Sequence, residues 1–357
     1  MKKIIACLLA LVMVLSLAAC GQHPFAPDKD GMINPSFIFT DSAGREVEVP
    51  TQIDRIAASG PLAQIMLFAL CPDMLAGVAT AWSADAEQYL DAAYYNLPVL
   101  GQLYGGKGDM NLETLLQSGA QIVIDIGQPK DTVVEDLDAL QEQTGIPFVH
   151  ITANIETFGE AYRMLGDLLG MSDAAETLAA CCEDIYARTC AIAERVDKVN
   201  ALYITGDEGQ NVIAKDSYHS EIIDLLTNNL AVVVEPSAKG TGNEVSMEQI
   251  MTWDPDYIIF APGSVYDAVA DDAVWQSLRA IRKGNYCEVP EGPYNWMGFP
   301  PGVQRYLGML WLSKVLYPDA TADDDLYTDV AEYYQLFYHC ELTQAQYDAL
   351  VAHSLGQ

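Results

Sequence analysis

One uninterrupted stretch, from Ser172 to Val196, constrains the fold of this chain more than any other feature. It contains neither glycine nor proline, and its apolar and small side chains recur every three or four residues, which predicts a helix with one buried stripe. Ser172 suits the N-cap, and Asp173 suits the positive end of the helix dipole. Such a helix would span roughly 37 Å, about the width of a small domain. It is therefore long enough to connect two domains.

An internal repeat flanks this stretch. Residues 111–124 (NLETLLQSGAQIVI) align without a gap with residues 246–259 (SMEQIMTWDPDYII), so that Glu113 matches Glu248. Each copy reads as a short helix that leads into a buried strand. One such match can arise by chance in a chain this long, but the repeat favours an α/β unit that occurs twice.

The length and hydrophobic content support two domains. A chain of 357 residues, half of them hydrophobic, can bury two sizeable cores. We therefore predict an α/β fold with two Rossmann-like lobes joined by a single long rigid helix. Strands are predicted in both lobes, including residues 75–79 in the first and 231–234 in the second. The predicted parts are the N-terminal lobe at 36–170, the linking helix at 171–197, the C-terminal lobe at 198–320 and a helical tail, packed against the rest, at 321–357.

The charge of the chain excludes one class of partner. The formal net charge is −32, whereas binding of nucleic acid phosphates needs a basic face. We expect no nucleic acid partner, and a well-solvated surface accounts for the charge.

The N-terminus predicts the location of the protein. Two lysines precede an apolar run, residues 4–17, that is too short to span a bilayer and suits a signal peptide over residues 1–19. The sequence Leu-Ala-Ala-Cys-Gly around Cys20 looks like a bacterial lipobox, in which Cys20 receives the lipid; the alternative is an ordinary secretory signal. Removal of residues 1–19 would take the formal charge to −34, because they hold two lysines and no acidic residue. With a flexible tether at 20–35, we expect a monomer that is lipid-anchored on the extracytoplasmic face of the cell membrane.

Several kinds of chemistry are absent from the sequence. It contains no P-loop, no G-x-S-x-G motif and no H-E-x-x-H motif. Its five histidines are scattered, whereas a bare transition-metal ion would need two or three imidazoles and a carboxylate. We therefore expect no cofactor and no metal ion held by the protein itself, and we expect a protein that is not an enzyme.

The loops that follow the predicted strands are the candidate binding elements, because ligands of parallel α/β sheets lie beyond the carboxyl ends of strands. The richest loop is residues 292–301 (GPYNWMGFPP), whose aromatic side chains we interpret as a wall for a large, partly apolar ligand. The alternative is a loop folded onto its own core. Lys239 and Arg305 could contact an anionic group of the ligand; the alternative for each is a surface charge without a ligand. The candidate ligand-binding residues are Ser59, Trp82, Tyr104, Gln128, Lys239, Asn243, Tyr294, Asn295, Trp296 and Arg305.

These features together resemble a known family. The lipobox, the segment 39–50 (FTDSAGREVEVP), the long helix and the doubled unit are similar to the substrate-binding lipoproteins of iron-complex and cobalamin ABC importers, which are class III periplasmic binding proteins. The first copy of the repeat has Gly119-Ala-Gln121 where the family usually has Pro-Asp. The resemblance implies a ligand cleft between lobes that close little, and a metal-chelate ligand: a ferric siderophore first, haem or a corrinoid next.

The resemblance also implies how the protein meets its importer. Members carry one acidic residue on each lobe that docks onto arginines of the permease, and Glu113 and Glu248 match those positions. Two equivalent carboxylates would suit a symmetric permease dimer. The alternative is two surface glutamates without a partner.

Three other functions remain open at this point. An oxyanion such as molybdate could bind through loop N–H groups and helix N-termini. An extracellular lipid-anchored hydrolase could use Asp125, Asp207 and His219. An adhesion or scaffold lipoprotein would have a filled region between its lobes.

Overall fold

The computed structural model describes residues 35–104 and 110–355. The predicted signal peptide, Cys20 and all of the tether except its last residue therefore lie outside the described residues. The described chain begins with an antiparallel hairpin of β1 (Ser36–Thr40) and β2 (Glu46–Pro50). Its turn contains Gly44 at a φ of 79°, a conformation that glycine adopts without steric cost.

The N-terminal lobe is built on three parallel strands in the order β3-β4-β5. These strands are buried almost throughout, as expected when helices cover both faces of a parallel sheet. The strands are β3 (Ile56–Ala58), β4 (Ile122–Gly127) and β5 (Phe148–Thr152); the helices are α2 (Pro61–Leu70), α3 (Ala92–Tyr95), α4 (Leu112–Ser118), α5 (Val133–Thr144) and the 3-10 turns η1 (Pro72–Met74) and η2 (Ala84–Gln88).

The C-terminal lobe contains a mixed sheet in the order β11-β10-β6-β7-β9, with β8 beside β6. Strands β11, β10, β6 and β8 run parallel, and β7 and β9 pair antiparallel at the edge. The strands are β6 (Asn200–Thr205), β7 (Asn211–Val212), β8 (Asn228–Asn229), β9 (Asn243–Glu244), β10 (Tyr257–Phe260) and β11 (Tyr286–Glu288); the helices are α8 (Glu221–Leu226), α9 (Met247–Trp253), α10 (Arg279–Arg282) and the 3-10 turns η3 (Tyr266–Ala268) and η4 (Trp275–Ser277).

The internal repeat has the same form in both lobes. Helices α4 and α9 each begin with a side-chain cap, since Asn111 and Ser246 accept a hydrogen bond from the amide three residues later. Each helix ends at a residue in the left-handed conformation, Gly119 or Asp254, and leads into a buried strand, β4 or β10.

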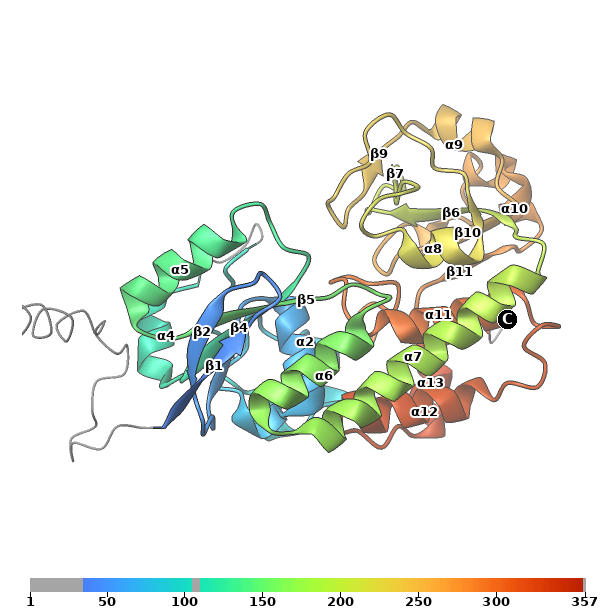
Figure 1. Cartoon of the computed structure of the whole chain (residues 1–357). Helices are drawn as coiled ribbons and strands as arrows, with labels where there is room; N and C mark the ends of the chain where they lie inside the picture. The colour runs from blue at the N-terminus through green and yellow to red at the C-terminus, as the bar shows by residue number, and fades with distance from the viewer. Residues whose placement is uncertain (1–34, 105–109, 356–357) are drawn as a thin grey trace, which may run out of the picture.

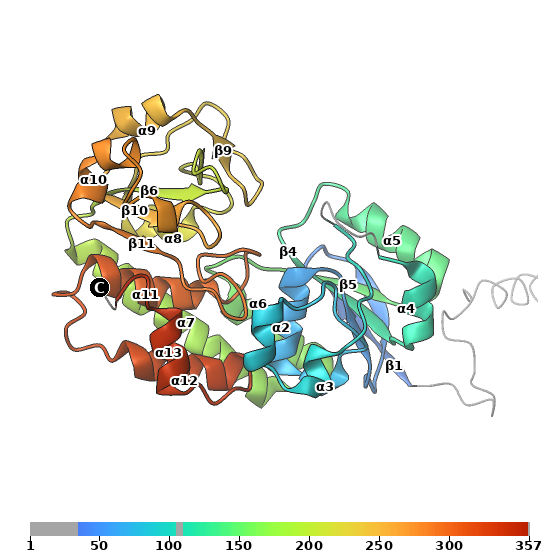
Figure 2. The same cartoon turned by 180° about the vertical axis from the view of Figure 1, so that it is seen from behind.

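Helix α6 (Phe158–Leu169) leads into α7 (Ser172–Arg195), which runs along both lobes in Figures 1 and 2. The predicted buried stripe is present, formed by Ala175, Leu178, Ala179, Cys182, Ile185, Thr189 and Ile192. Ser172 is the first helical residue and not the cap, which is Met171, so that detail of the prediction was wrong.

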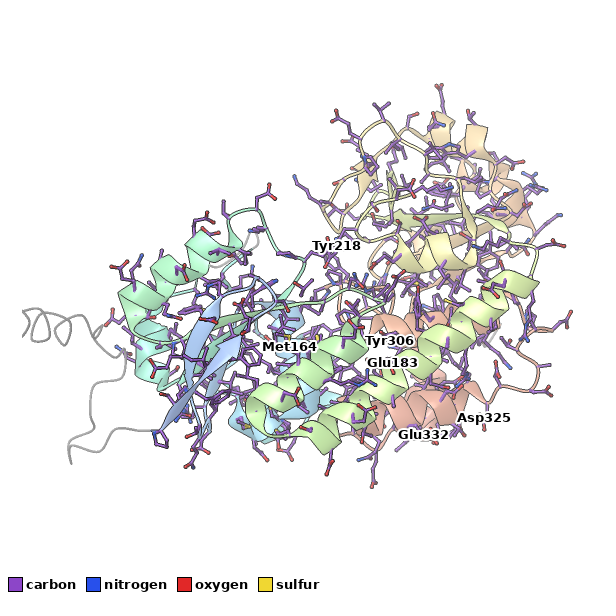
Figure 3. All side chains as sticks on the ribbon, viewed as in Figure 1. Met164, Glu183, Tyr218, Tyr306, Asp325 and Glu332 are labelled. Atoms are coloured by element: carbon purple, nitrogen blue, oxygen red, sulfur yellow. The ribbon has the colours of Figure 1, made fainter. Side chains whose placement is uncertain are left out.

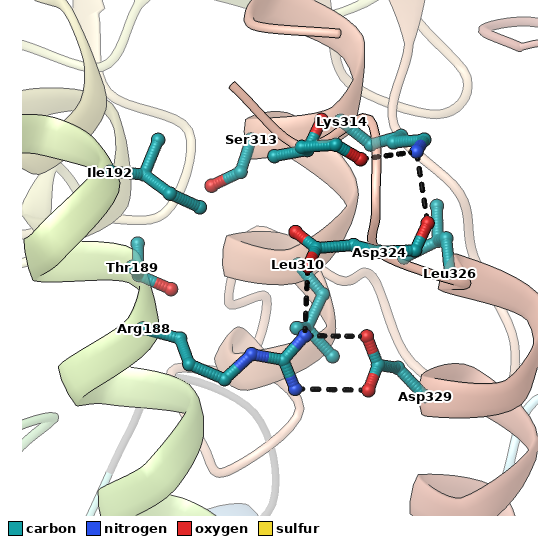
Figure 4. A pocket seen from close by; sticks show the side chains of 10 residues that line it. Arg188, Thr189, Ile192, Leu310, Ser313, Lys314, Asp324, Leu326 and Asp329 are labelled. Carbon is teal, nitrogen blue, oxygen red and sulfur yellow. Dashed lines mark hydrogen bonds and ion pairs between the residues drawn. The ribbon is translucent and has the colours of Figure 1, made fainter. Parts of the chain in front are cut away.

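The C-terminal helices are α11 (Arg305–Leu316), α12 (Leu326–Phe337) and α13 (Gln344–Leu350); α11 packs against α7 and α12, and α12 packs against α13. Figure 4 shows Arg188 of α7 donating two hydrogen bonds, of 3.0 and 2.7 Å, to Asp329 of α12. Lys314 donates to the backbone carbonyl oxygens of Thr321 and Asp324 nearby, and the remaining cavity of about 10 Å³ holds no more than about one water molecule. This region is therefore structural.

The tail also contacts the N-terminal lobe. Nε2 of His339 lies 3.0 Å from the carbonyl oxygen of Phe68, and the Gln346 side chain donates to the carbonyl oxygen of Gln88 at 3.2 Å. One continuous hydrophobic core contains residues of both lobes, of α7 and of the tail. The tail thus braces the two lobes against each other.

The two-lobed α/β architecture predicted from the sequence is confirmed. Two expected strands are absent from the described residues. Residues 75–79 form only isolated bridges, and residues 231–234 are irregular, with Val234 99% exposed. Among the described helices, none combines the length and the apolar composition needed to cross a bilayer.

Candidate ligand-binding cleft

An open cleft of about 750 Å³ lies between the lobes. It lies beyond the carboxyl ends of β3 and β4, where parallel α/β sheets bind ligands. Figure 3 shows Tyr218 in the space between the two lobes. The described residues that line the cleft are Pro61, Leu62, Gln102, Tyr104, Asp125, Ile126, Gly127, Gln128, Pro129, Lys130, Val133, Tyr218, Ala238, Pro300 and Pro301. A scaffold protein with a filled interlobe region does not fit this cleft.

Tyr104 and Lys130 form one wall. The Lys130 ammonium lies 3.6 Å from the centroid of the Tyr104 ring, a cation–π contact. The Tyr104 hydroxyl donates to Asp136 at 3.4 Å. Burial, with the nearby carboxylates of Asp125 and Asp136, raises the pKa of Tyr104, so its hydroxyl stays protonated at neutral pH. Gln128 is exposed on the same loop, so two predicted residues, Tyr104 and Gln128, do line the cleft.

The first turn of α2 meets the cleft at Pro61 and Leu62. None of the described side chains caps this helix, and its first turn holds no acidic residue. The positive end of the helix dipole and the amides of the first turn are therefore available to an anionic group of a ligand.

Asp125, near the carboxyl end of β4, contributes a carboxylate to the lining, and the residue is 6% exposed. Ser59, also buried, donates its Oγ–H to Oδ1 of Asp125 at 2.5 Å. Nδ1 of His150 lies 2.7 Å from Oδ2. The carboxylate thus separates the serine from the histidine, so His150 cannot act as the base for Ser59, as it would in a catalytic triad.

The hydrolase interpretation grouped Asp125 with Asp207 and His219. The cluster that the structure forms around Asp125 contains Ser59 and His150 instead. His219 belongs to the other lobe and lies 3.4 Å from the carbonyl oxygen of Gly298.

The predicted aromatic wall was wrong, because the loop at 292–301 folds onto the core. Trp296 is fully buried, and Asn295 accepts a hydrogen bond from the amide of Met297 at 2.8 Å. Tyr294 is half-buried against Trp82, with ring centroids 5.6 Å apart. Trp82 is itself buried in the core of the N-terminal lobe. Only the end of the loop reaches the cleft, through Pro300 and Pro301, with Phe299 54% exposed beside them.

Arg305, Lys239 and Asn243 do not line the cleft either. Arg305 is 1% exposed and ion-paired with Glu221, and burial lowers the pKa of its guanidinium to about 10. Lys239 is exposed next to the lining residue Ala238. Asn243 shapes its own loop, since it accepts from the amide of Ser237 and donates to the carbonyl oxygen of Glu235, at 2.8 and 2.9 Å.

Sequence reasoning missed Lys130 and Tyr218 as lining residues. Lys130 lies in the loop after β4 that already contained Gln128, so the same strand-end argument could have included it. Tyr218 carried no such signal, because it lies between β7 and α8 on an irregular segment. The described residues contain no group of three or more His, Cys, Asp and Glu side chains that could hold a metal ion.

Comparison with known proteins identifies the family. A family model described as periplasmic binding protein matches residues 66–292. The chain belongs to this family. The resemblance inferred from the sequence is thereby confirmed, and the protein is a solute-binding protein and not an enzyme.

Individual relatives agree with this assignment. An ABC transporter solute-binding protein from Sulfurospirillum deleyianum has a TM-score of 0.80 at 26% identity, over 88% of this chain and 99% of its own. The molybdate-binding protein MolA of Haemophilus influenzae is 23% identical over 84% of this chain and 90% of its own, and its structure with molybdate has a TM-score of 0.68. The catecholate-siderophore-binding protein VctP of Vibrio cholerae has a TM-score of 0.53 at 15% identity, over 71% of this chain and 91% of its own.

Proposed function

We propose that this protein captures a metal chelate in the interlobe cleft and delivers it to an ABC importer. A ferric siderophore is the first candidate, and haem or a corrinoid the next. The observation that carries the proposal is the cleft itself. Its volume of about 750 Å³ lies within the roughly 300–1,000 Å³ typical of small-molecule sites. Its walls combine proline, leucine, isoleucine and tyrosine side chains with a few polar groups, which suits an organic chelate better than a bare ion.

An oxyanion is the second candidate ligand. The uncapped start of α2 and the Lys130 ammonium both supply positive potential to the cleft. The relative MolA binds molybdate, and VctP binds a catecholate siderophore. The two relatives therefore support different ligands, and a direct titration is needed.

The deciding experiment is calorimetric titration of the chain without residues 1–19 against ferric hydroxamate and catecholate siderophores, haemin, cobalamin and molybdate. We expect saturation at one ligand per chain by one chelate class. Saturation by molybdate alone would favour the second candidate, and no binding by the folded protein would overturn the proposal. Calorimetry is preferable to tryptophan fluorescence, because Trp82 and Trp296 are buried away from the cleft lining.

We further propose that Glu113 and Glu248 dock onto the permease dimer. Both are exposed at the second position of matching helices, α4 and α9. Three residues later each helix exposes an apolar side chain, Leu116 at 51% and Met251 at 38%. Residues three apart share a helix face, so each lobe presents a carboxylate beside an apolar group.

The membrane anchor is the last part of this proposal. Cys20 in the lipobox-like sequence would carry the lipid and hold a monomer on the extracytoplasmic face. The test is fractionation of cells that express the full chain with Cys20→Ser. Release of the variant from the membrane fraction supports the anchor, and retention contradicts it.

A further inference from the structure

The Asp125 carboxylate is held in place by neighbours on the two adjacent strands. Asp125 pairs in register with His150 of β5, and Ser59 directly follows β3. The Ser59 amide donates to the carbonyl oxygen of Ile124 at 3.0 Å, and its carbonyl oxygen accepts from the amide of Leu103 at 2.7 Å. The second ring nitrogen of His150, Nε2, lies 3.2 Å from Oγ1 of Thr152. The carboxylate therefore keeps a fixed position, with both of its partners belonging to the N-terminal lobe.

The carboxylate also keeps acceptor capacity that the cleft can use. An ionised carboxylate has about four acceptor sites on its two oxygens, and Ser59 and His150 occupy one on each oxygen. Asp125 is nevertheless one of the residues that line the cleft. A ligand that presents an N–H or O–H group could therefore complete its hydrogen bonding.

The cleft lining carries few charges, and these charges differ in how far they are buried. The described lining contains two charged side chains, Asp125 and Lys130. Lys130 is exposed against the Tyr104 ring, where water and salt screen its charge, whereas Asp125 is buried and its charge is screened less. A free dianion close to Asp125 would meet an unfavourable charge, whereas an ammonium group would meet a favourable one.

We propose that Asp125 is a specificity-determining residue of the cleft, with Ser59 and His150 as its positioning residues. It selects metal chelates that present a positively charged donor, such as an ammonium group, to its carboxylate, and it disfavours free oxyanions. The inference rests on the proposed function, because it assumes that the cleft binds a solute. It narrows the substrate class to chelates that carry a cationic donor at one end.

The test compares two chelates that differ in one group. Ferrioxamine B is a ferric trihydroxamate with a free ammonium group, and in its N-acetyl derivative that group is a neutral amide. We expect the wild-type chain without residues 1–19 to bind ferrioxamine B at least about tenfold more tightly than the derivative. This comparison needs no variant, so it holds even if changes at Asp125 impair folding.

Two variants then test whether Asp125 causes the preference for ferrioxamine B over its N-acetyl derivative. In Asp125→Asn, whose amide can still accept from Ser59, we expect the ratio between the two chelates to fall close to one and molybdate binding to strengthen about tenfold. Asp131→Asn is the matched control, because it removes the same charge from an exposed residue that follows β4 and lies outside the lining. It should keep the wild-type ratio.

The outcomes separate this inference from the proposed function. An equal affinity of the wild type for the two chelates, or an unchanged ratio in Asp125→Asn, overturns the inference. Binding of a catecholate, haemin or cobalamin without binding of ferrioxamine B also overturns it and leaves the proposed function intact. If the folded wild type binds none of these probes, the proposed function itself is wrong.

Discussion

Trp82 and Tyr294 lie with their ring centroids 5.6 Å apart and join the N-terminal lobe to the loop that precedes α11. The side-chain amide of Gln64 donates to the Tyr294 hydroxyl at 3.1 Å across the same contact. Trp82 and Tyr294 were predicted to contact the ligand, but in the structure they hold the two lobes together.

This contact predicts a separation between stability and binding. Tyr294→Ala should lower the free energy of unfolding by about 2–3 kcal/mol, because it removes a half-buried ring from the aromatic contact. Tyr294→Phe should lose only the hydrogen bond, about 1 kcal/mol. Urea unfolding measures both, and ligand affinity should change less than twofold in Tyr294→Phe. A large loss of ligand affinity in Tyr294→Phe would indicate that Tyr294 contacts the ligand after all.

Lys130 should contribute to binding of anionic groups, and a matched lysine is available as a control. Lys130→Ala removes an ammonium that lines the cleft, so the affinity for an anionic ligand such as molybdate or a ferric catecholate should fall about tenfold. Lys239→Ala removes the same charge from an exposed residue outside the lining and should have less than a twofold effect. Calorimetry checks both, and equal losses would indicate a general charge effect.

Charge reversal should separate docking from ligand capture. Glu113→Arg combined with Glu248→Arg should reduce uptake in cells at least about tenfold, because like charges would face each other across the interface. Ligand affinity of the purified variant should stay unchanged. Glu142→Arg, on the exposed surface of α5, is the control and should not affect uptake. Normal uptake by the double variant would exclude this docking mode.

His219 predicts a pH dependence of stability. Burial, helped by the nearby Arg305, lowers the pKa of His219 below its ordinary value of 6.5. The unfolded state then binds a proton more readily than the folded state, so stability is complete above pH 6.5 and decreases as the pH falls below it. The urea midpoint should fall less steeply from pH 7 to pH 5 in His219→Gln than in the wild type. Parallel pH profiles would assign the loss to other groups.

The sequence predicted the architecture well because periodicity and the repeat depend on local features. The spacing of apolar residues in α7 and the match of Glu113 to Glu248 require no knowledge of long-range contacts. The prediction of a strand at 231–234 was wrong, because an apolar run does not by itself show whether its side chains are buried. Val234 lies in solvent. Solvent exposure depends on the tertiary arrangement.

The site was predicted only in part for a related reason. Tyr104 and Gln128 follow from the rule that ligands lie beyond strand ends, and that rule does not depend on side-chain direction. Whether the ring of Trp296 points into the cleft or into the core depends on packing against other segments. For the same reason, the sequence did not predict the contact among Asp125, Ser59 and His150. These residues are far apart in sequence and meet only through strand pairing.

The continuous core that runs through both lobes, α7 and the tail has a consequence for exchanging parts between relatives. A lobe taken from another binding protein would leave the inner surface of α2 and the tail helices without their partners. The residues that line the cleft, in contrast, lie mostly at strand ends and in loops outside that core. New ligand preferences can therefore arise by replacing loops one at a time, while whole lobes cannot be interchanged.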